Sequence, residues 1–329
     1  MQSPPASPSI AVLDDYQKVA LKSADWSALA TKATIKTFHD PWPNEDAVAL
    51  ALEPFQIIAL MRERTPFPAS LIARLPNLRM IALTGTRTNT LDIAACTERG
   101  ILISHTSGNP STAAAELNFA LILACARALP QAFGNMAAGR WEEEVPMGTP
   151  LAGKRLGVLG LGHLGKEVAR MAQGFRMDVV AWSQNLTAEA AALHGCRLVS
   201  KAELFATSDV VSLNLVLSDR TRGIVGREEL SSMKQGAILV NAARAGLVDQ
   251  AALMDALQSR KITAGLDVFD REPLAANHAL RKMPNAVLTP HLGYVVDDVF
   301  RYYYRDIIED IEAYISGKPI RVLNPDVMR

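Results

Sequence analysis

Three polar residues in the last third of the chain have side chains that can bind a carboxylate and move a proton. Arg244 lies in the segment VNAARAG (240–246), Glu272 in DVFDREP (267–273) and His291 in LTPHLG (288–293). An arginine fork can clamp a carboxylate and polarise a neighbouring carbonyl group. Histidine exchanges a proton near neutral pH, and a glutamate beside it would orient the ring and favour its charged form. The three residues together therefore suit acid–base chemistry on a substrate that carries a carboxylate.

A second motif, in RLGVLGLGHLG (155–165), is typical of dinucleotide binding. An apolar run typical of a strand opens into G-x-G-x-x-G, followed by helical spacing to about residue 175 and a second apolar run at 179–182. Gly160 permits a tight turn, Gly162 removes the Cβ that would meet the phosphates, and Gly165 lets the helix approach the strand. The free N–H groups and positive dipole end of the helix favour the pyrophosphate.

The elements needed to position these residues alternate between strands and helices along the whole chain. Buried strands are expected at 10–13, 57–60 and 80–83, then near 156–160, 178–182, 209–215, 237–241, 263–267 and 286–289. This alternation predicts an α/β protein with parallel sheets that carry helices on both faces, in two domains. Asn109-Pro110 should start an apolar helix that runs to about Leu129, and a last helix should run from about Val296 to Ser316. The polar stretch 139–153 is interpreted as a linker.

The expected domain boundaries follow from this layout. Residues 1–110 and 296–329 are assigned to the substrate domain, and residues 111–295 to the dinucleotide-binding domain, which is inserted into it. Open sheets bind ligands at the carboxyl ends of their strands, so Arg244, Glu272 and His291 should meet at one edge.

Composition excludes several other classes of protein. The 329 residues are 49% apolar and 21% charged, with 34 basic and 34 acidic side chains. This balance argues against nucleic acid or a membrane surface as partner. The isolated cysteines (Cys96, Cys125 and Cys196) form no metal-ligand pattern, so neither a metal site nor a disulfide framework is expected and a cytoplasmic location is the simplest. The first nine residues are interpreted as a disordered lead-in and not as a signal peptide.

In four ordered motifs the chain resembles the D-isomer-specific 2-hydroxyacid dehydrogenases. These are L-x-G-K followed by G-x-G-x-x-G, then N-x-A-R-x-x-x-V-D, D-V-F-x-x-E-P and T-P-H, and the resemblance covers nearly the whole chain. It implies two doubly wound parallel-sheet domains, a flavodoxin-like substrate domain and a Rossmann nucleotide-binding domain, with a cleft between them. It also implies an NAD(P)-dependent oxidoreductase that interconverts a 2-keto acid and the (R)-2-hydroxy acid. In that scheme Arg244 holds the substrate carboxylate, while His291 and Glu272 form the acid–base pair.

The resemblance also implies binding residues and an assembly. Cofactor contacts are expected from Gly160, Gly162, His163, Leu164, Gly165, Ser183, Ala242, Asp267 and Gly293. Substrate contacts are expected from Arg62, Thr86 and Arg87, and a homodimer is expected. The similarity is to D-3-phosphoglycerate dehydrogenase-like short forms, so a regulatory domain after residue 329 is not expected.

Departures from the family pattern concern mainly the cofactor side. Where NAD-preferring members carry an acidic residue for the ribose hydroxyls, this chain has Ser183, and Gln184 follows where NADP users often have arginine. NAD is the first expectation, and NADP is not excluded. Asn214 and Val216 stand where many members have His and Pro. Arg87 replaces a common glycine, and with Arg62 and Arg64 it could bind a second anionic group.

Other interpretations remain open at this stage. Arg244 could instead be a structural ion-pair partner, Glu272 a surface carboxylate, His291 a structural histidine and Asp267 a structural residue at a strand end. The arginines of the first domain could simply pair with Glu63. As a whole, the chain could be a dinucleotide-sensing corepressor of the same fold. A formate dehydrogenase is disfavoured, because it would carry glutamine in place of Glu272.

Overall fold

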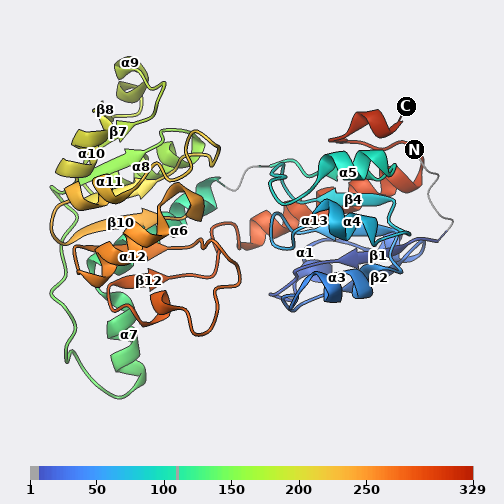
Figure 1. Ribbon diagram of the computed structural model, residues 1–329, viewed down its shortest axis with the longest axis horizontal. Helices are drawn as coiled ribbons and strands as arrows, with labels where there is room; N and C mark the ends of the chain where they lie inside the picture. The colour runs from blue at the N-terminus through green and yellow to red at the C-terminus, as the bar shows by residue number, and fades with distance from the viewer. Residues whose placement is uncertain (1–6, 109–110, 329) are drawn as a thin grey trace. The chain divides into compact units, whose positions relative to one another are not determined.

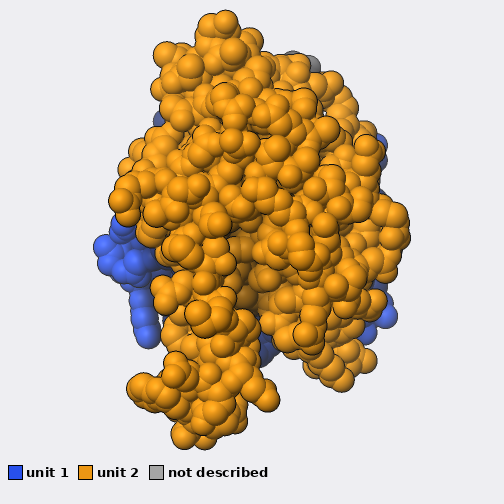
Figure 2. Space-filling model, turned by 90° about the vertical axis from the view of Figure 1, so that its left-hand side faces the viewer, with its two compact units in different colours: residues 1–109, 295–329 blue, residues 110–294 orange. Residues whose placement is uncertain are grey.

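The computed structural model describes residues 7–108 and 111–328, with only the backbone of Ser111. The chain divides into two compact units, which Figure 2 colours separately. Unit 1 comprises residues 1–109 and 295–329, and unit 2 comprises residues 110–294. The helix start expected at Asn109-Pro110 and most of the N-terminal lead-in lie outside the described residues.

Unit 1 is built on a five-stranded parallel sheet with the strand order β2-β1-β3-β4-β5 (Figure 1). This is the flavodoxin-like order that the sequence predicts. The strands are β1 (Ser9–Val12), β2 (Thr34–Thr37), β3 (Ile57–Leu60), β4 (Met80–Leu83) and β5 (Leu102–His105). The helices are α1 (Ala20–Ser23), α2 (Ser27–Ala30), α3 (Glu45–Leu52), α4 (Ala69–Ala73), α5 (Ile93–Glu98) and α13 (Asp297–Ile315), and a 3₁₀ helix, η3, spans Pro325–Met328.

Buried apolar strands explain why this sheet forms. Every residue of β3 and β4 is buried, as expected for parallel strands covered by helices on both faces. The last helix, α13, returns to this unit, packing against α1, β4 and β5. Of its three consecutive tyrosines, Tyr303 and Tyr304 are fully buried and Tyr302 is partly exposed.

Unit 2 contains a seven-stranded parallel sheet with the order β12-β11-β10-β9-β6-β7-β8. The order reverses at β6, so the carboxyl ends of β6 and β9 form the switch point at which such sheets bind dinucleotides. The Rossmann fold expected for this part of the chain is confirmed. The strands are β6 (Arg155–Leu159), β7 (Asp178–Trp182), β8 (Arg197–Leu198), β9 (Val210–Leu213), β10 (Ala237–Asn241), β11 (Ile262–Leu266) and β12 (Ala286–Leu288).

Helices cover both faces of the unit 2 sheet and create two separate apolar cores. α6 and α8 pack together over one face, and the neighbouring α10, α11 and α12 contribute to the core on the other. The helices are α6 (Ser111–Ala126), α7 (Leu129–Ala137), α8 (His163–Gly174), α9 (Ala188–Ala192), α10 (Lys201–Thr207), α11 (Arg227–Ser232) and α12 (Gln250–Gln258), with 3₁₀ helices η1 (Ala245–Leu247) and η2 (Ala279–Lys282).

Two sequence expectations in this unit need correction. The long apolar helix ends at Ala126, and a separate amphipathic helix, α7, follows it after a residue with left-handed backbone geometry, Ala128. The stretch 139–153 is irregular, as expected, but it lies inside unit 2 between α7 and β6 and does not link the two units.

Among the described residues no single helix is long and apolar enough to cross a membrane. The α6 and α7 segments satisfy the length and composition criteria only as a pair, and a bend of 72° separates them.

Candidate active site

Glu272 and His291 form a direct hydrogen-bonded pair. His291 follows β12 and Glu272 lies in the segment after the neighbouring strand β11, and their Nδ1 and Oε2 atoms are 2.6 Å apart. The other carboxylate oxygen of Glu272 accepts a hydrogen bond from the Phe269 backbone N–H at 2.9 Å. Burial opposes ionisation of Glu272, but the hydrogen bond and charge of His291 outweigh it and hold the pKa of this carboxyl below its usual range. The pair is therefore arranged as a carboxylate facing an imidazole.

Asp267 holds the turn that carries His291. Its carboxylate is fully buried and accepts hydrogen bonds from the Thr289 hydroxyl at 2.6 Å and from the backbone N–H groups of Leu292 and Gly293 at 2.7 and 3.0 Å. His291 lies between these anchors with φ of 56°, in the left-handed region that non-glycine residues seldom adopt. Burial raises the pKa of Asp267, against the hydrogen bonds that favour its charged form. Its described contacts thus match the structural interpretation left open above.

Arg244 lies just beyond the end of β10, the strand next to β11, and its backbone conformation is fixed by Asn241. The Asn241 side chain accepts from the Ala243 N–H at 3.1 Å and donates to the Arg244 carbonyl oxygen at 2.9 Å. The Arg244 guanidinium donates to the Ala243 carbonyl oxygen, and its charge also helps to lower the pKa of Glu272. The structure therefore brings Arg244, Glu272 and His291 to one edge of the sheet, as predicted.

The glycine turn between β6 and α8 has the geometry of a phosphate cradle. Gly160 has a φ of 102°, and a Cβ on Gly165 would lie 2.0 Å from the Gly160 carbonyl oxygen, so both positions require glycine. A Cβ on Gly162 would instead meet nothing within 4 Å. Gly162 caps α8 without a side-chain hydrogen bond, and both Gly162 and the first helical residue, His163, are exposed. The first N–H groups of a helix have no partner within the helix, so this start is accessible to an anion. These residues fit the pyrophosphate of a dinucleotide.

Ser183, at the end of β7, is directly connected to this turn. Its hydroxyl oxygen accepts a hydrogen bond from the Leu161 backbone N–H at 3.1 Å. Ser183 thus helps to fix the turn, and it contributes no charge where the cofactor's ribose is expected. Gln184 beside it is exposed and also neutral. Leu164 and Ala242, both predicted cofactor contacts, are half-buried and buried respectively.

Comparisons with known proteins identify the family of this chain. A sequence model described as "D-isomer specific 2-hydroxyacid dehydrogenase, NAD binding domain" matches residues 119–293. The chain belongs to the D-isomer-specific 2-hydroxyacid dehydrogenase family. It is 33% identical to a glyoxylate reductase of Aeropyrum pernix over 300 residues, which cover 88% of this chain and 89% of that protein. It also superimposes on a solved phosphoglycerate oxidoreductase from Vibrio cholerae with a TM-score of 0.90 and 35% identity, covering 94% of this chain and 99% of the other.

Some relatives of this chain are longer proteins. A D-3-phosphoglycerate dehydrogenase of Archaeoglobus fulgidus is 37% identical over 263 residues, which are 80% of this chain and 50% of the relative. The chain therefore spans about half the length of the first such relatives that it matches.

The predicted substrate residues lie in loops of unit 1 at the carboxyl ends of β3 and β4. Arg62 has a φ of 51°, its N–H donates to the Thr84 hydroxyl at 2.8 Å, and its guanidinium donates to the Tyr303 hydroxyl at 2.7 Å. Thr86 and Arg87 are exposed. Glu63 accepts from the Asn89 side chain at 2.7 Å.

Arg64 has a different role from the one that the basic cluster suggested. Its guanidinium donates to the Asp14 carbonyl oxygen at 2.7 Å and lies 4.6 Å from the ring centroid of Tyr16. The Asp14 carboxylate in turn accepts from the Thr65 hydroxyl at 2.9 Å. Arg64 therefore fastens the loop that carries Arg62 to the segment after β1.

Sequence reasoning assigned no function to Asn241, Thr289 or Tyr303, although each fixes a candidate residue. The N-x-A-R and T-P-H motifs contained the first two, and only the hydrogen bonds reveal what they do.

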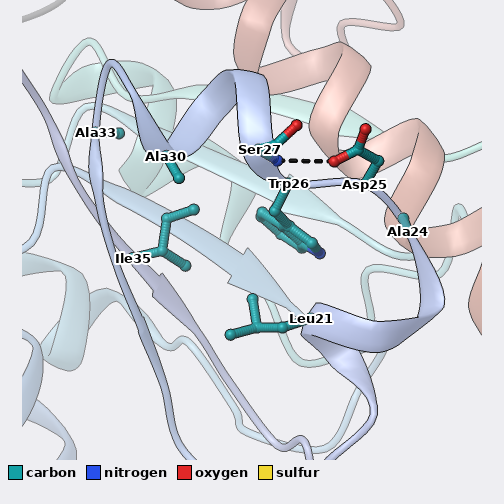
Figure 3. Close-up of a pocket in the computed structure, with 8 residues that line it drawn as sticks. All are labelled: Leu21, Ala24, Asp25, Trp26, Ser27, Ala30, Ala33 and Ile35. Atoms are coloured by element: carbon teal, nitrogen blue, oxygen red, sulfur yellow. Dashed lines mark hydrogen bonds between the residues drawn. The ribbon is translucent and has the colours of Figure 1, made fainter.

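The groove in unit 1 shown in Figure 3 contains none of the candidate residues. It lies beside α1, α2 and the edge strand β2, where Leu21, Trp26 and Ile35 line it, and its one carboxylate, Asp25, accepts from the Ser27 N–H. Among the described residues no group of three or more metal-binding side chains is found.

Proposed function

We propose that this protein catalyses the reversible reduction of a 2-keto acid to the (R)-2-hydroxy acid with a nicotinamide dinucleotide. The observation that carries the proposal is the 2.6 Å contact between His291 Nδ1 and Glu272 Oε2, on the same unit as the glycine cradle. Membership of the family supports the reaction type. A dinucleotide bound at the cradle would supply the hydride to the ketone carbon, or accept it in the reverse direction.

The proton in this scheme passes through His291. Because Glu272 occupies Nδ1, the other ring nitrogen, Nε2, is the one to donate a proton to the ketone oxygen during reduction. The Glu272 carboxylate stabilises the imidazolium before transfer and fixes the orientation of the ring. In the oxidative direction, the neutral ring accepts the hydroxyl proton.

Arg244 is proposed to bind the substrate carboxylate. Its planar fork suits two parallel hydrogen bonds to a carboxylate, and its charge polarises the adjacent ketone. Asn241 supports this role by fixing the backbone on both sides of Arg244. Arg62, Thr86 and Arg87 are proposed to contact the rest of the substrate, with Arg62 and Arg87 suited to a second anionic group.

NAD is the proposed cofactor, and NADP is not excluded. The contacts are assigned to Gly160, Gly162, His163, Leu164, Gly165, Ser183, Ala242, Asp267 and Gly293. Since Ser183 and Gln184 are uncharged, neither repulsion nor attraction of a 2′-phosphate is built into this position, and discrimination between the two cofactors should be weak.

A homodimer is proposed as the assembly. The support within this chain is a set of exposed apolar side chains on α7 and the segment after it. These two segments extend away from the unit 2 sheet (Figure 1). Exposed apolar surface of this kind favours a protein partner. These side chains are Phe133, Met136, Trp141 and Met147.

The experiment that tests this proposal is a screen of 2-keto acids with NADH and with NADPH, following the absorbance of the reduced cofactor. Turnover of at least one 2-keto acid that disappears in His291→Ala supports the assignment. A protein that binds the dinucleotide but turns over no keto acid would instead support the dinucleotide-sensing corepressor interpretation.

A further inference from the structure

Two consecutive buried aspartates follow β1 at the carboxyl end of the unit 1 sheet, and they bind different partners. Asp14 and Asp15 are 1% and 2% exposed. Both oxygens of the Asp14 carboxylate accept from the hydroxyl of Thr65, in the loop after β3, at 2.9 Å. The Asp15 carboxylate instead accepts from the backbone N–H groups of Val19 and Ala20 at 2.8 and 3.2 Å, at the start of α1. The two aspartates therefore hold different parts of the chain.

The Asp14 contacts lie at the switch point of the unit 1 sheet. The strand order reverses at β1, so the carboxyl ends of β1 and β3 flank the position at which such sheets bind ligands. In this protein, side chains of the protein itself bridge that position. The Arg64 guanidinium donates to the Asp14 carbonyl oxygen at 2.7 Å, and the Tyr16 hydroxyl donates to the Asp14 carboxylate at 3.2 Å. Asp14 thus joins the segment after β1 to the loop after β3.

The backbone at these strand ends needs support from such contacts. Asp14 and Arg62 each lie two residues after the end of a strand, and their φ values are 58° and 51°. Gly85 has the same place after β4, with φ of 76°. Left-handed conformations at residues other than glycine persist only where the surrounding structure holds them, and they cluster at binding and active sites. Arg62 is one of the proposed substrate residues, so the contacts that hold its loop bear on substrate binding.

The loop 61–65 is held from both of its ends. At one end the Arg62 N–H donates to the Thr84 hydroxyl at 2.8 Å, and at the other end Thr65 donates to Asp14. Within the loop the Arg64 N–H donates to the Met61 carbonyl oxygen at 3.2 Å. Because the loop is short and closed by this bond, a shift at Thr65 is transmitted to the backbone of Arg62.

We propose that Asp14 is a positioning residue for substrate binding, whose carboxylate holds the loop 61–65 so that Arg62 meets the bound keto acid. The inference rests on the proposed function, because it assumes that Arg62 contacts the substrate. Asp14 should therefore affect the affinity for the keto acid. It should not affect the dinucleotide, whose proposed contacts all belong to unit 2.

The test combines steady-state kinetics with a keto acid and titration with NADH, on the full-length protein. Asp14→Ala should raise KM for the keto acid about tenfold and change kcat and the NADH dissociation constant by less than about twofold. Thr65→Val removes the hydroxyl on the other side of the contact and should have a similar effect. The double variant should raise KM no further than the worse single variant, since both substitutions remove the same hydrogen bond.

Two control variants separate positioning from general stability. Asp14→Asn keeps a residue that tolerates left-handed backbone, and its amide can accept from and donate to the Thr65 hydroxyl, so KM should stay within about threefold of the unmodified value. Asp15→Ala removes an equally buried carboxylate from the next position. It should lower the melting temperature, because the hydrogen bonds at the start of α1 are lost, and leave KM unchanged. If Asp14→Ala does not fold, Thr65→Val decides the test by itself.

Three results would overturn the inference. The first is an unchanged KM in Asp14→Ala and Thr65→Val, and the second is an equal rise of KM in Asp15→Ala. The third is a KM in Asp14→Asn as high as in Asp14→Ala, which would show that the Thr65 hydrogen bond is not the cause. Failure of the unmodified protein to turn over any keto acid would contradict the proposed function itself, so the two failures are distinguishable.

Discussion

Glu272 and His291 come from segments that follow two adjacent strands, and their side chains meet at 2.6 Å. Each residue of the pair is also positioned by a second set of hydrogen bonds. Glu272 accepts the Phe269 N–H, and the His291 turn is anchored on the buried Asp267. These contacts fix the pair without help from a ligand, which is the arrangement that a proton-transfer site needs.

Substitutions at two glycines of the cradle should affect fold stability and cofactor binding differently. Gly162→Ala adds a methyl group into open space, so the melting temperature should stay nearly constant while NADH binding is lost. Gly165→Ala forces a methyl group against the Gly160 carbonyl oxygen and should cost about 1–3 kcal/mol of unfolding free energy. Thermal unfolding and NADH titration of both variants check this. Equal destabilisation by the two substitutions would contradict the assigned roles.

Cofactor discrimination should be weak in this protein. We expect less than about a hundredfold difference between the dissociation constants for NADH and NADPH, about 2.7 kcal/mol. Ser183→Asp should shift the preference towards NADH, because a carboxylate repels the 2′-phosphate and accepts hydrogen bonds from ribose hydroxyls. Fluorescence titration of both cofactors measures the ratio. A ratio that Ser183→Asp leaves unaltered would show that this residue does not face the ribose.

Arg244→Ala should raise KM for the keto acid strongly and lower kcat, with little effect on NADH affinity. Lysine at this position should restore little activity, because a point charge does not reproduce a two-bond carboxylate clamp. Steady-state kinetics on the three proteins test this. A large fall in melting temperature for Arg244→Ala would favour a structural ion-pair role instead.

Tyr303→Phe should affect the substrate and not the cofactor. The substitution removes only the hydroxyl that accepts from Arg62. If Arg62 binds a second anionic group, KM for keto acids that carry one should rise about tenfold as Arg62 loses its orientation. Tyr314→Phe is the control, because this α13 tyrosine is also buried and its hydroxyl has no partner among the described residues. Identical KM values in both variants and the unmodified protein would exclude Arg62 from this role.

The alternation of apolar runs predicted both sheets, but not all of their strands. β2 was missed because it lies at a sheet edge and its four residues, TIKT, are only half-buried. Two other edge strands, β5 and β8, were not expected either. The helix α7 was missed because apolar composition continues across Ala128, where the backbone turns. Buried strands with continuous apolar runs were predictable from the sequence. Edge strands and breaks between helices were not, because they depend on tertiary packing that the apolar pattern does not contain.

The candidate site residues that lie in sequence motifs were predictable. Arg244, Glu272 and His291 were expected at one sheet edge because parallel strands end together. The residues that fix them were not predictable, since contacts such as Arg62 with Tyr303 join positions far apart in the sequence. The same is true of Asp14 and Thr65, which meet only after β1 pairs with β3.

The pH dependence of keto-acid reduction in the unmodified protein and in Glu272→Gln tests the central claim most directly. Reduction needs the imidazolium of His291, so kcat/KM should fall as pH rises and the ring loses its proton. A carboxylate beside an imidazole favours its charged form, so removing the charge of Glu272 should move this fall to lower pH. His291→Ala should lose about a hundredfold or more in rate at every pH. A fall at the same pH in Glu272→Gln, with NADH binding intact, would contradict the claim that the two residues act as one acid–base pair.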